Sequence, residues 1–305
     1  MRPRISVVVA TRNRQQQLAR ALASIDAQRY RRFEVIVVDD GSADGTAAWL
    51  RAQRPQDCVV ETDRPRGAAA ARNRGVARAR GDIVAFLDDD DAWRASYLEA
   101  QVEQLDADLG VDLCTTGHVE IDPAGRVSHP DVRPVFEYAN PLVHLLAECP
   151  VHTLSVVACR RAVFARIGSF DETLEIAHDL DWYLRLLAAG GRFAHNRAAL
   201  VERGVPGGLV TGHRRWFSEE RAVHRRVFAA GFVGPAQERR IRASRALLFA
   251  RISFAKGDLR FGLARLAGAF AASPLDAARI SGVRLRRWAR NRPAGVWTAG
   301  AAGRQ

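Results

Sequence analysis

The chain has 305 residues, of which 48% are hydrophobic and 26% are charged. This is the composition of a globular protein with a large core, and it excludes intrinsic disorder and collagen-like order. The sequence has no run of about 18 uncharged apolar residues, and its short apolar start is flanked by arginines, so we expect neither a membrane-spanning helix nor a signal sequence and predict a cytoplasmic protein.

The formal net charge of +12 is distributed unevenly along the chain. Residues 1–210 carry 26 lysines and arginines against 29 aspartates and glutamates, a net charge of −3, whereas residues 211–305 carry 20 against 5, a net charge of +15. The basic character therefore belongs to the C-terminal third. The four cysteines show no CxxC pairing, which predicts neither a disulfide framework nor a zinc site.

The first 110 residues alternate short β-branched runs with helical patterns. The predicted strands are 5–9, 33–38, CVVE near residue 60 and DIVAFL at 82–87. Helical patterns lie between them, through Leu18 and Leu22, through Trp49 and Leu50, and between the glycines of GAAAARNRGVARARG. Such alternation predicts an α/β fold with a mostly parallel sheet flanked by helices.

Beyond residue 110 the pattern changes. Strands are predicted near 111–116 and 154–159, and HDLDWYLRLLAAGG is strongly helical. From residue 218 onward the sequence is helical, with breaks at Pro235 and Pro274. Residues 245–274 predict a helix, a Gly-Asp turn and a return helix.

Four consecutive aspartates, Asp88 to Asp91, follow the apolar strand at 82–87. Adjacent carboxylates repel one another, so a fold that gathers them usually has a cation to offset the repulsion. Mg²⁺ and Mn²⁺ take oxygen ligands, and Mg²⁺ commonly uses one or two carboxylates together with water and substrate phosphates. The cluster predicts either a divalent metal site at a strand end, where ligands bind in open α/β sheets, or a solvated acidic loop before the next helix.

Asp39 and Asp40 end the strand at 33–38 on the same edge of the sheet, because parallel strands share their carboxyl ends. A carboxylate there can accept hydrogen bonds from a nucleotide base or ribose, and the alternative is a turn-forming pair before Gly41. A dinucleotide site is excluded, since ATRNRQQQL after the first strand lacks the glycines of G-x-G-x-x-G.

Several segments together carry a resemblance to a known family: SVVVATRNR, VIVVDDGSADGT, GAAAARNRGVARARGDIVAFLDDDD, GSFDE and HDLDWYLRL. In this order and spacing they resemble the inverting family 2 glycosyltransferases, which have the GT-A fold, over roughly residues 4–210. The resemblance implies a catalytic domain at 1–210, with a nucleotide-sugar-binding half at 1–110 and an acceptor half at 111–210. Residues 211–305 are then an appended basic α-helical region.

The same resemblance implies which residues hold the nucleotide. The segment Ala10, Thr11 and Arg12 and the carboxylate of Asp40 are expected around the base and ribose of a sugar nucleotide. Arg72, in the segment ARNRG, is expected to lie against the nucleotide as well.

It also implies a metal site. Asp88 and Asp90 match the family's Asp-x-Asp pair, which meets Mn²⁺ or Mg²⁺ on the donor diphosphate, and Asp89 between them is expected to face the donor sugar or its ribose. Many relatives add a histidine to the metal shell from the loop that corresponds to ERGVPGGLVTGH, where this chain has Val205. His213 is either a replacement ligand or a surface histidine beside Arg214 and Arg215.

The family usually has Glu-Asp before the last core helix, and the matching pair here is His178 and Asp179. Asp179 is the candidate general base that accepts the proton of the acceptor hydroxyl. The alternative for Asp179 is a helix cap, and Asp181 or His178 can take either role. His178 either tunes acceptor choice or has no part in it.

The resemblance implies a metal-dependent single displacement with inversion at the sugar, which needs one catalytic carboxylate instead of the pair found in glycosidases. The cation stabilises the leaving nucleoside diphosphate. A UDP-sugar is the first expected donor, ahead of dTDP- and GDP-sugars. The acceptor is a hydroxyl of a polysaccharide, a lipid-linked glycan or a small natural product.

The basic C-terminal third leaves two interpretations open. With Trp216, Trp288 and Trp297 it can lie on an anionic membrane surface, which would make the protein peripheral on the cytoplasmic face. Residues 236–275 are better explained as a helical hairpin packed on the core, while 283–292 favour the membrane.

Two other classes of function are weighed against the enzyme. A non-catalytic sugar-nucleotide-binding protein is favoured by the loss of the family glutamate at His178. A nucleic-acid-binding protein is favoured by the basic tail but disfavoured by the net acidic residues 1–210 and by the lack of a recognised binding motif. We therefore expect no nucleic-acid partner.

Overall fold

A computed structural model describes residues 3–122, 124–128, 130–131, 140–149, 151–204 and 212–280. The chain divides into two compact units, Met1–Gly234 and Pro235–Gln305. The expected boundary near residue 210, Val205 and the segment 283–292 all lie outside the described residues.

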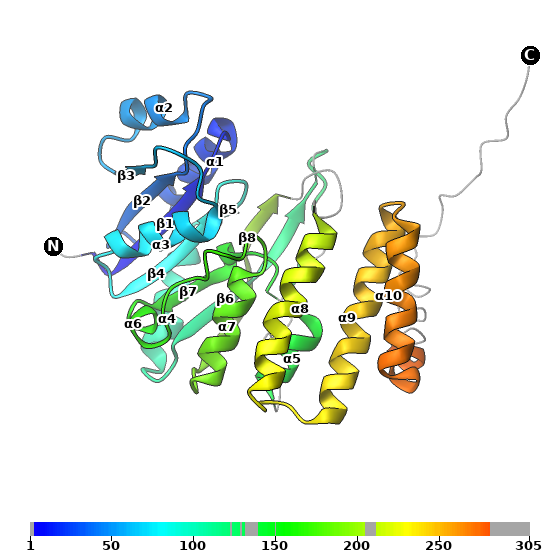
Figure 1. The fold of residues 1–305 in the computed structure, drawn as a ribbon. Helices are drawn as coiled ribbons and strands as arrows, with labels where there is room; N and C mark the ends of the chain where they lie inside the picture. The colour runs from blue at the N-terminus through cyan, green and yellow to red at the C-terminus, as the bar shows by residue number, and fades with distance from the viewer. Residues whose placement is uncertain are drawn as a thin grey trace, which may run out of the picture. The chain divides into compact units, whose positions relative to one another are not determined.

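The described part of the first unit forms an eight-stranded sheet with helices flanking it (Figure 1). The strand order is β3-β2-β1-β4-β7-β6-β8-β5. The pairs β3–β2, β2–β1, β1–β4 and β6–β8 are parallel, while β4–β7, β7–β6 and β5–β8 are antiparallel. The strands are β1 (Ile5–Thr11), β2 (Phe33–Asp39), β3 (Cys58–Glu61), β4 (Ile83–Asp88), β5 (Ala92–Trp93), β6 (Leu113–Ile121), β7 (Val157–Arg160) and β8 (Phe193–Gly204).

The helices of the first unit follow the helical patterns of the sequence. For example, Leu18, Leu22 and Ile25 recur at helical spacing and are buried against the core. The helices are α1 (Gln15–Asp26), α2 (Thr46–Gln53), α3 (Ala68–Arg78), α4 (Tyr97–Ala107), α5 (Pro141–Glu148), α6 (Ala162–Ile167), α7 (His178–Ala188) and α8 (His213–Ala229), with a 3₁₀ turn at Leu154–Val156. The mixed, mostly parallel α/β sheet and its flanking helices confirm the predicted fold class.

The central strands end together at one edge of the sheet. Ala10 of β1 is in register with Val38 of β2 and with Asp88 of β4, and Thr11 is in register with Asp39. The β-branched and aliphatic residues before these positions are buried, which fixes the strands in the core up to their last residues. The acidic ends of β2 and β4 therefore flank the end of β1, as the sequence predicts.

Helix α3 packs closely on this sheet because of a glycine. A Cβ atom at Gly75 would lie 2.4 Å from Cγ1 of Val8, closer than carbon atoms can approach. The close packing fixes the height of α3 above β1 and, with it, the position of Arg72 one turn earlier on the helix.

The second unit contains the predicted helical hairpin. Helix α9 (Pro235–Ala255) and helix α10 (Leu259–Ala272) are joined by a short turn, and the Asp258 side chain accepts a hydrogen bond from the backbone N–H of Phe261 at the start of α10. Among the described residues, no helix combines the length and the hydropathy needed to cross a bilayer.

Candidate functional site

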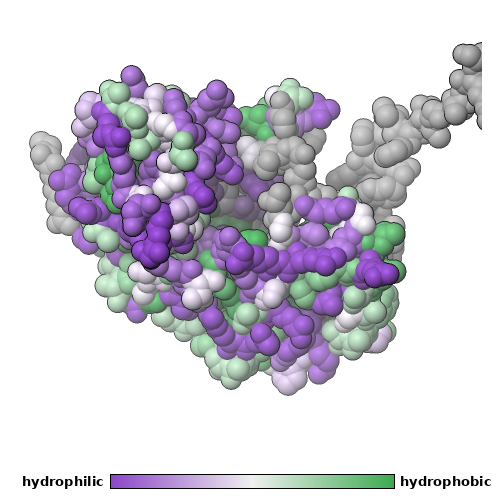
Figure 2. Space-filling view, turned by 45° about the horizontal axis from the view of Figure 1, so that its top comes forward, coloured by the Kyte–Doolittle hydropathy of each residue, from purple (hydrophilic) through white to green (hydrophobic). Residues whose placement is uncertain are grey.

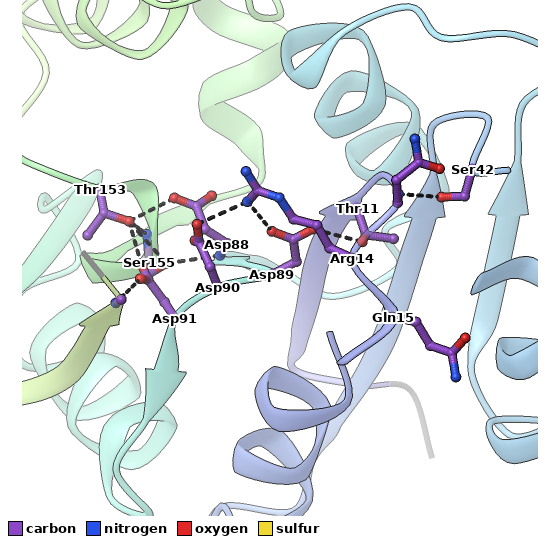
Figure 3. A network of polar contacts seen from close by, with 12 residues as sticks. Thr11, Arg14, Gln15, Ser42, Asp88, Asp89, Asp90, Asp91, Thr153 and Ser155 are labelled. Carbon is purple, nitrogen blue, oxygen red and sulfur yellow. Dashed lines mark hydrogen bonds and ion pairs between the residues drawn. The ribbon is translucent and has the colours of Figure 1, made fainter. Parts of the chain in front are cut away.

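The candidate site lies at the shared end of β1, β2 and β4, where the structure brings several of the predicted residues together. Asp88 is the last residue of β4, and Asp89, Asp90 and Asp91 follow it. Figure 3 shows these carboxylates beside Thr11 and Arg14 from the end of β1 and beside Thr153 and Ser155, which come from the segment before β7.

Asp88 is held by a cation and a hydroxyl group. Arg72 Nη2 donates to its Oδ1 over 2.6 Å, and Thr153 Oγ1 lies 2.8 Å from its Oδ2. Burial raises the pKa of Asp88, but the positive charge of Arg72 and the hydrogen bonds from Thr153 and Arg72 outweigh burial and hold that pKa below its ordinary value. Asp88 is therefore a carboxylate at neutral pH.

Arg72 also joins helix α3 to the start of helix α7. Its Nη1 lies 2.7 Å from Nε2 of His178. Because a guanidinium only donates hydrogen bonds, His178 accepts through Nε2 and carries its proton on Nδ1. Burial and the nearby charge of Arg72 lower the pKa of His178 to about 3, so this histidine is neutral.

Asp89 and Asp90 share a second arginine. Thr11 Oγ1 donates to Asp89 Oδ2 over 2.8 Å, and Arg14 Nη1 lies 3.0 Å from an oxygen of each aspartate (Figure 3). Burial raises the pKa of both carboxyl groups, and a neighbouring aspartate adds to the rise in each case. Arg14 thus partly neutralises a loop whose charges would otherwise repel one another.

Asp91 has a different environment from its three neighbours. It is buried, Ser155 Oγ donates to its Oδ2 over 2.6 Å, and the backbone N–H of Gly204 donates to its Oδ1 over 2.9 Å. Burial and the charge of Asp88 raise its pKa to about 7. Thr153 Oγ1 lies 2.8 Å from both Asp88 and Asp91, and its single hydrogen serves one of them at a time, which agrees with a proton on Asp91.

Asp179, the predicted base, is the second residue of α7. Its Oδ1 accepts a hydrogen bond from the backbone N–H of Leu180 over 2.7 Å. Burial raises the pKa of Asp179 to about 6, and the opposing charges of Arg72 and Asp88 both act on it, which places it in the same electrostatic environment as the β4 aspartates. A carboxylate with this pKa suits general base catalysis near neutral pH.

At the end of β2, the predicted nucleotide ligand Asp40 is already engaged by the backbone. Its carboxylate accepts from the N–H groups of Arg66 and Gly67 over 2.8–3.0 Å, and Thr62 Oγ1 lies 3.3 Å away. Asp39 Oδ1 accepts from the N–H of Ser42, but the buried Asp39 Oδ2 has no hydrogen-bond partner among the residues that the structure describes. A buried carboxylate oxygen without a donor is unfavourable and is a place for a ligand donor to bind.

The remaining predicted residues lie at the ends of secondary-structure elements or directly after them. Ala10 and Thr11 are the last two residues of β1, and Arg12 follows with an exposed side chain that makes no hydrogen bond to another predicted site residue in the described part of the chain. His213 is the first residue of α8.

Three residues at the site were not predicted from the sequence: Arg14, Thr153 and Ser155. Arg14 lies two residues after the predicted residue Arg12, so adjacency was a usable signal. Thr153 and Ser155 had none, since they are more than 60 residues away along the chain from the aspartates that they bind.

The donor set fits a hard divalent ion that is shared with a ligand. The carboxylate oxygens of Asp88 and Asp90 are the ligands that Mg²⁺ and Mn²⁺ prefer. Arginines contact both aspartates, which shows that cations are favoured here. In the described residues, no group of three or more histidine, cysteine, aspartate or glutamate side chains is placed to hold a metal by itself, so phosphate and water would complete the coordination.

Comparison with known proteins identifies the family. The protein-family model described as "Glycosyl transferase family 2" matches residues 6–168, slightly more than half of the chain. This chain belongs to glycosyl transferase family 2. The match spans the strand ends and the four aspartates described above.

Two curated relatives of this glycosyltransferase come from bacteria. The succinoglycan biosynthesis protein ExoO of Rhizobium meliloti (strain 1021) is 30% identical over 261 residues, which cover 80% of this chain and 74% of that protein. The pre-mycofactocin glycosyltransferase of Mycobacterium tuberculosis (strain ATCC 25618 / H37Rv) is 30% identical over 230 residues, which cover 65% of this chain but 42% of that protein. The chain therefore spans less than half of the second relative.

Solved structures share the fold. TarS 1–349 of S. aureus superimposes with a TM-score of 0.64 at 22% identity and covers 94% of this chain and 86% of that one. The mannosyltransferase PcManGT of Pyrobaculum calidifontis, in complex with GDP-Man and Mn²⁺, gives a TM-score of 0.58 at 25% identity, with coverage of 95% and 81%. The glycosyltransferase thus has the GT-A fold that the sequence predicts.

Proposed function

We propose that this glycosyltransferase moves a sugar from a nucleoside-diphosphate sugar to an acceptor hydroxyl, with inversion at the anomeric carbon and with Mn²⁺ or Mg²⁺. The observation that carries the proposal is that Arg72 joins the aspartates after β4 to the start of α7, where Asp179 supplies a single carboxylate. The aspartates after β4 support binding of a diphosphate with its cation, and Asp179 supports the presence of a single proton acceptor.

The donor is bound at the ends of β1 and β2. Ala10, Thr11 and Arg12 lie at the end of β1, and the partnerless Oδ2 of Asp39 offers an acceptor for an N–H or hydroxyl group of the nucleotide. Asp40 supports this surface indirectly by holding the backbone of Arg66 and Gly67. A UDP-sugar is the first donor to test, ahead of dTDP- and GDP-sugars. TarS was solved with UDP-GlcNAc, and PcManGT was solved with GDP-Man, so both classes belong in the panel.

Asp88 and Asp90 would hold the divalent ion against the donor diphosphate, with Arg72 beside them. The ion supplies positive charge where negative charge develops on the leaving diphosphate. Arg72, anchored between Asp88 and His178, adds a fixed positive charge next to the same groups. Asp89, held by Thr11, faces the donor sugar or its ribose.

Asp179 acts as the general base. The acceptor oxygen attacks the anomeric carbon while its proton passes to the carboxylate of Asp179, and the bond to the diphosphate breaks. A single displacement of this kind needs one such carboxylate. Neutral His178 cannot accept this proton readily, since its pKa is about 3 and its Nε2 accepts the Arg72 hydrogen bond.

The acceptor belongs to cell-surface or natural-product chemistry. ExoO is named for succinoglycan biosynthesis and the mycobacterial relative for pre-mycofactocin, so both a polysaccharide or lipid-linked intermediate and a small natural product are candidate acceptors. The acceptor half, taken as residues 111–210, contributes Asp179 and Thr153 to the site.

The test is a panel of nucleotide sugars scored by thermal shift with and without Mn²⁺, followed by transfer assays. We expect one nucleotide to raise the melting temperature in a Mn²⁺-dependent way, because a ligand that binds the folded state stabilises it. Asp179→Asn should then lose transfer and donor hydrolysis while it keeps the donor-induced shift. If Asp179→Asn turns over the donor as fast as the natural protein, the catalytic assignment is wrong.

The second unit supports a contact with anionic lipid. Leu259, Leu263 and Phe270 share one face of α10 and are 61%, 59% and 42% exposed. Figure 2 shows apolar residues at the surface among many hydrophilic ones. Because Pro235–Gln305 carries 15 basic and 3 acidic residues, it repels a second copy and attracts an anionic surface.

Co-sedimentation of the full chain with vesicles of phosphatidylglycerol and phosphatidylcholine tests this contact. We expect binding that Leu259→Ser with Leu263→Ser weakens and that Leu109→Ser, at a leucine 78% exposed in the first unit, leaves unchanged. Unchanged binding of the double variant would show that α10 is not the lipid-facing surface.

A further inference from the structure

The start of helix α7 has one side-chain acceptor of its own, since Asp179 Oδ1 accepts from the backbone N–H of Leu180. The residue at the N-cap position is Ala177, which offers no side-chain acceptor, and the structure shows no side-chain cap hydrogen bond there. The first N–H groups of a helix have no partner within the helix and need an acceptor from elsewhere. At α7 the acceptor that meets the segment leading into the helix comes from α8, about 40 residues further along the chain.

That acceptor is the carboxylate of Glu219. Its Oε2 accepts from the backbone N–H groups of Ile176 and Ala177 over 2.8 and 3.1 Å, and its Oε1 accepts from the N–H of Glu175 over 3.2 Å. Three consecutive backbone groups immediately before His178 are therefore bound by one side chain. A carboxylate in this position also interacts favourably with the positive end of the α7 helix dipole.

Glu219 is itself fixed. Its side chain is 11% exposed, and Arg215, one turn earlier on α8, donates from Nε to Oε1 over 3.0 Å and also pairs with Glu175. Burial raises the pKa of Glu219, but the three backbone hydrogen bonds and Arg215 outweigh burial and keep that pKa below its ordinary value. The group is therefore ionised and held from both sides.

Helix α8 contacts α7 at a second point, one turn further along α7. Arg226 Nη1 lies 3.1 Å from Asp171 Oδ2 and 3.3 Å from Asp181 Oδ1. Asp181 is two residues after Asp179 in the first turn of the helix. The segment around Asp179 is thus tied to α8 at two points, by the backbone N–H groups before it and by the side chain of Asp181 after it.

We propose that Glu219 is a positioning residue for the general base: it sets the first turn of α7 and, through the backbone, the direction of the Asp179 carboxylate. This inference rests on the proposed role of Asp179. Because a displacement of about 1 Å at a reacting group can cost about 10²-fold in rate, loss of the Glu219 carboxylate acts on the chemical step and not on donor binding.

The experiment compares Glu219→Ala and Glu219→Gln with a control, Glu238→Ala. Glu238 also pairs with an arginine one turn away, Arg242, but it lies on α9 and in the second unit. We expect kcat to fall about 10- to 100-fold in Glu219→Ala. Donor KM and the donor-induced thermal shift should stay within about threefold, and Glu238→Ala should match the natural protein. Glu219→Gln, which keeps one acceptor oxygen, should recover part of the kcat.

A double-mutant cycle separates positioning from stability alone. If Glu219 acts through Asp179, Glu219→Ala should have little further effect on the residual transfer rate of Asp179→Asn, whereas a loss through general destabilisation should persist there. The proposal is overturned if folded Glu219→Ala keeps the natural kcat, or if kcat and donor affinity fall together. An Asp179→Asn protein with natural kcat would instead refute the base assignment itself.

Discussion

The two acidic strand ends of this glycosyltransferase have similar sequences and different environments. After β2, Asp40 is bound by backbone N–H groups of the loop before α3. After β4, Asp88, Asp89 and Asp90 are bound by the side chains of Arg72, Arg14, Thr11 and Thr153. A carboxylate held by backbone groups stabilises the fold, whereas carboxylates held by arginine side chains can exchange these partners for a ligand or a metal ion.

The largest test of this contrast is Asp88→Asn. Asn keeps the shape of the side chain but removes the charge that faces Arg72 and the expected cation, so we expect transfer to fall about 10²- to 10³-fold. Mn²⁺ affinity, followed by electron paramagnetic resonance in the presence of the nucleoside diphosphate, should fall as well. A variant that binds Mn²⁺ and transfers sugar normally would place the metal elsewhere.

The pH dependence of kcat extends the comparison to Asp179. In the described part of the chain the carboxylate of Asp179 accepts one backbone hydrogen bond, from Leu180, and pairs with no arginine. Since its pKa is raised to about 6 and the base must be ionised, kcat should fall about tenfold per pH unit below pH 6. A pH profile at saturating substrate measures this limb. A limb centred near pH 4 would contradict it.

The same raised pKa has a consequence for stability. The folded protein holds the Asp179 proton up to about pH 6, whereas the unfolded chain releases it near its ordinary value of 3.8, so this group lowers stability as pH rises between those values. At pH 7 Asp179→Asn should therefore be more stable by on the order of 3 kcal/mol. Urea titrations at pH 4 and pH 7 should show the gain at pH 7 and little at pH 4.

Asp39 and Asp40 should respond in opposite ways to substitution. Asp40→Ala leaves the N–H groups of Arg66 and Gly67 without their acceptor and should lower the free energy of unfolding by about 1–3 kcal/mol. Asp39→Asn keeps the bond from Ser42 but replaces the partnerless oxygen with a donor, so it should weaken donor binding about tenfold with little loss of stability. Calorimetric titration of the donor and urea unfolding of both variants measure these effects. Equal donor losses in both would remove the distinction between the two carboxylates.

Arg14→Ala should have the smallest effect, and one of opposite sign. Arg14 is about half exposed and neutralises Asp89 and Asp90, and it competes with a divalent ion for Asp90. A pair of this kind contributes about 0.2–1 kcal/mol, so its removal should tighten Mn²⁺ binding by about two- to fivefold. Arg80→Ala, which removes an exposed arginine paired with Glu34 away from the site, is the control. Weaker Mn²⁺ binding in Arg14→Ala would assign Arg14 to the diphosphate instead.

The sequence predicted the elements whose signals are local. The β-branched runs became β1, β2 and β4, and the segment with Lys256, Gly257 and Asp258 became the turn between α9 and α10. Strand β8 was not predicted, because its exposure pattern does not alternate and its pairing with β6 shifts register twice between Thr116 and His118. A strand of this kind is specified by its neighbours and not by its own periodicity.

In the candidate site, too, some features were predicted from the sequence and others depend on the tertiary structure. Asp88, Arg72 and Asp179 were predicted as site residues from the family resemblance, and the structure brings Arg72 into contact with Asp88 and with His178. The sequence did not show that Asp40, and not Asp39, is bound by the backbone. This depends on the loop at Arg66 and Gly67, whose N–H groups lie beside Asp40 in the folded chain. No motif carries that information.

The amino-acid sequence by itself determined the alternation of strands and helices, the acidic groups at the strand ends and the basic character of the C-terminal third. These features depend on hydrophobic periodicity, turn residues and charge, which are properties of residues close together in the sequence. Only the tertiary structure decided which partners those acidic groups have: Thr153 and Ser155 on the β4 aspartates, backbone amides on Asp40, and Glu219 at the start of α7. These contacts join residues tens of positions apart, and they form only when packing of the core brings the segments together.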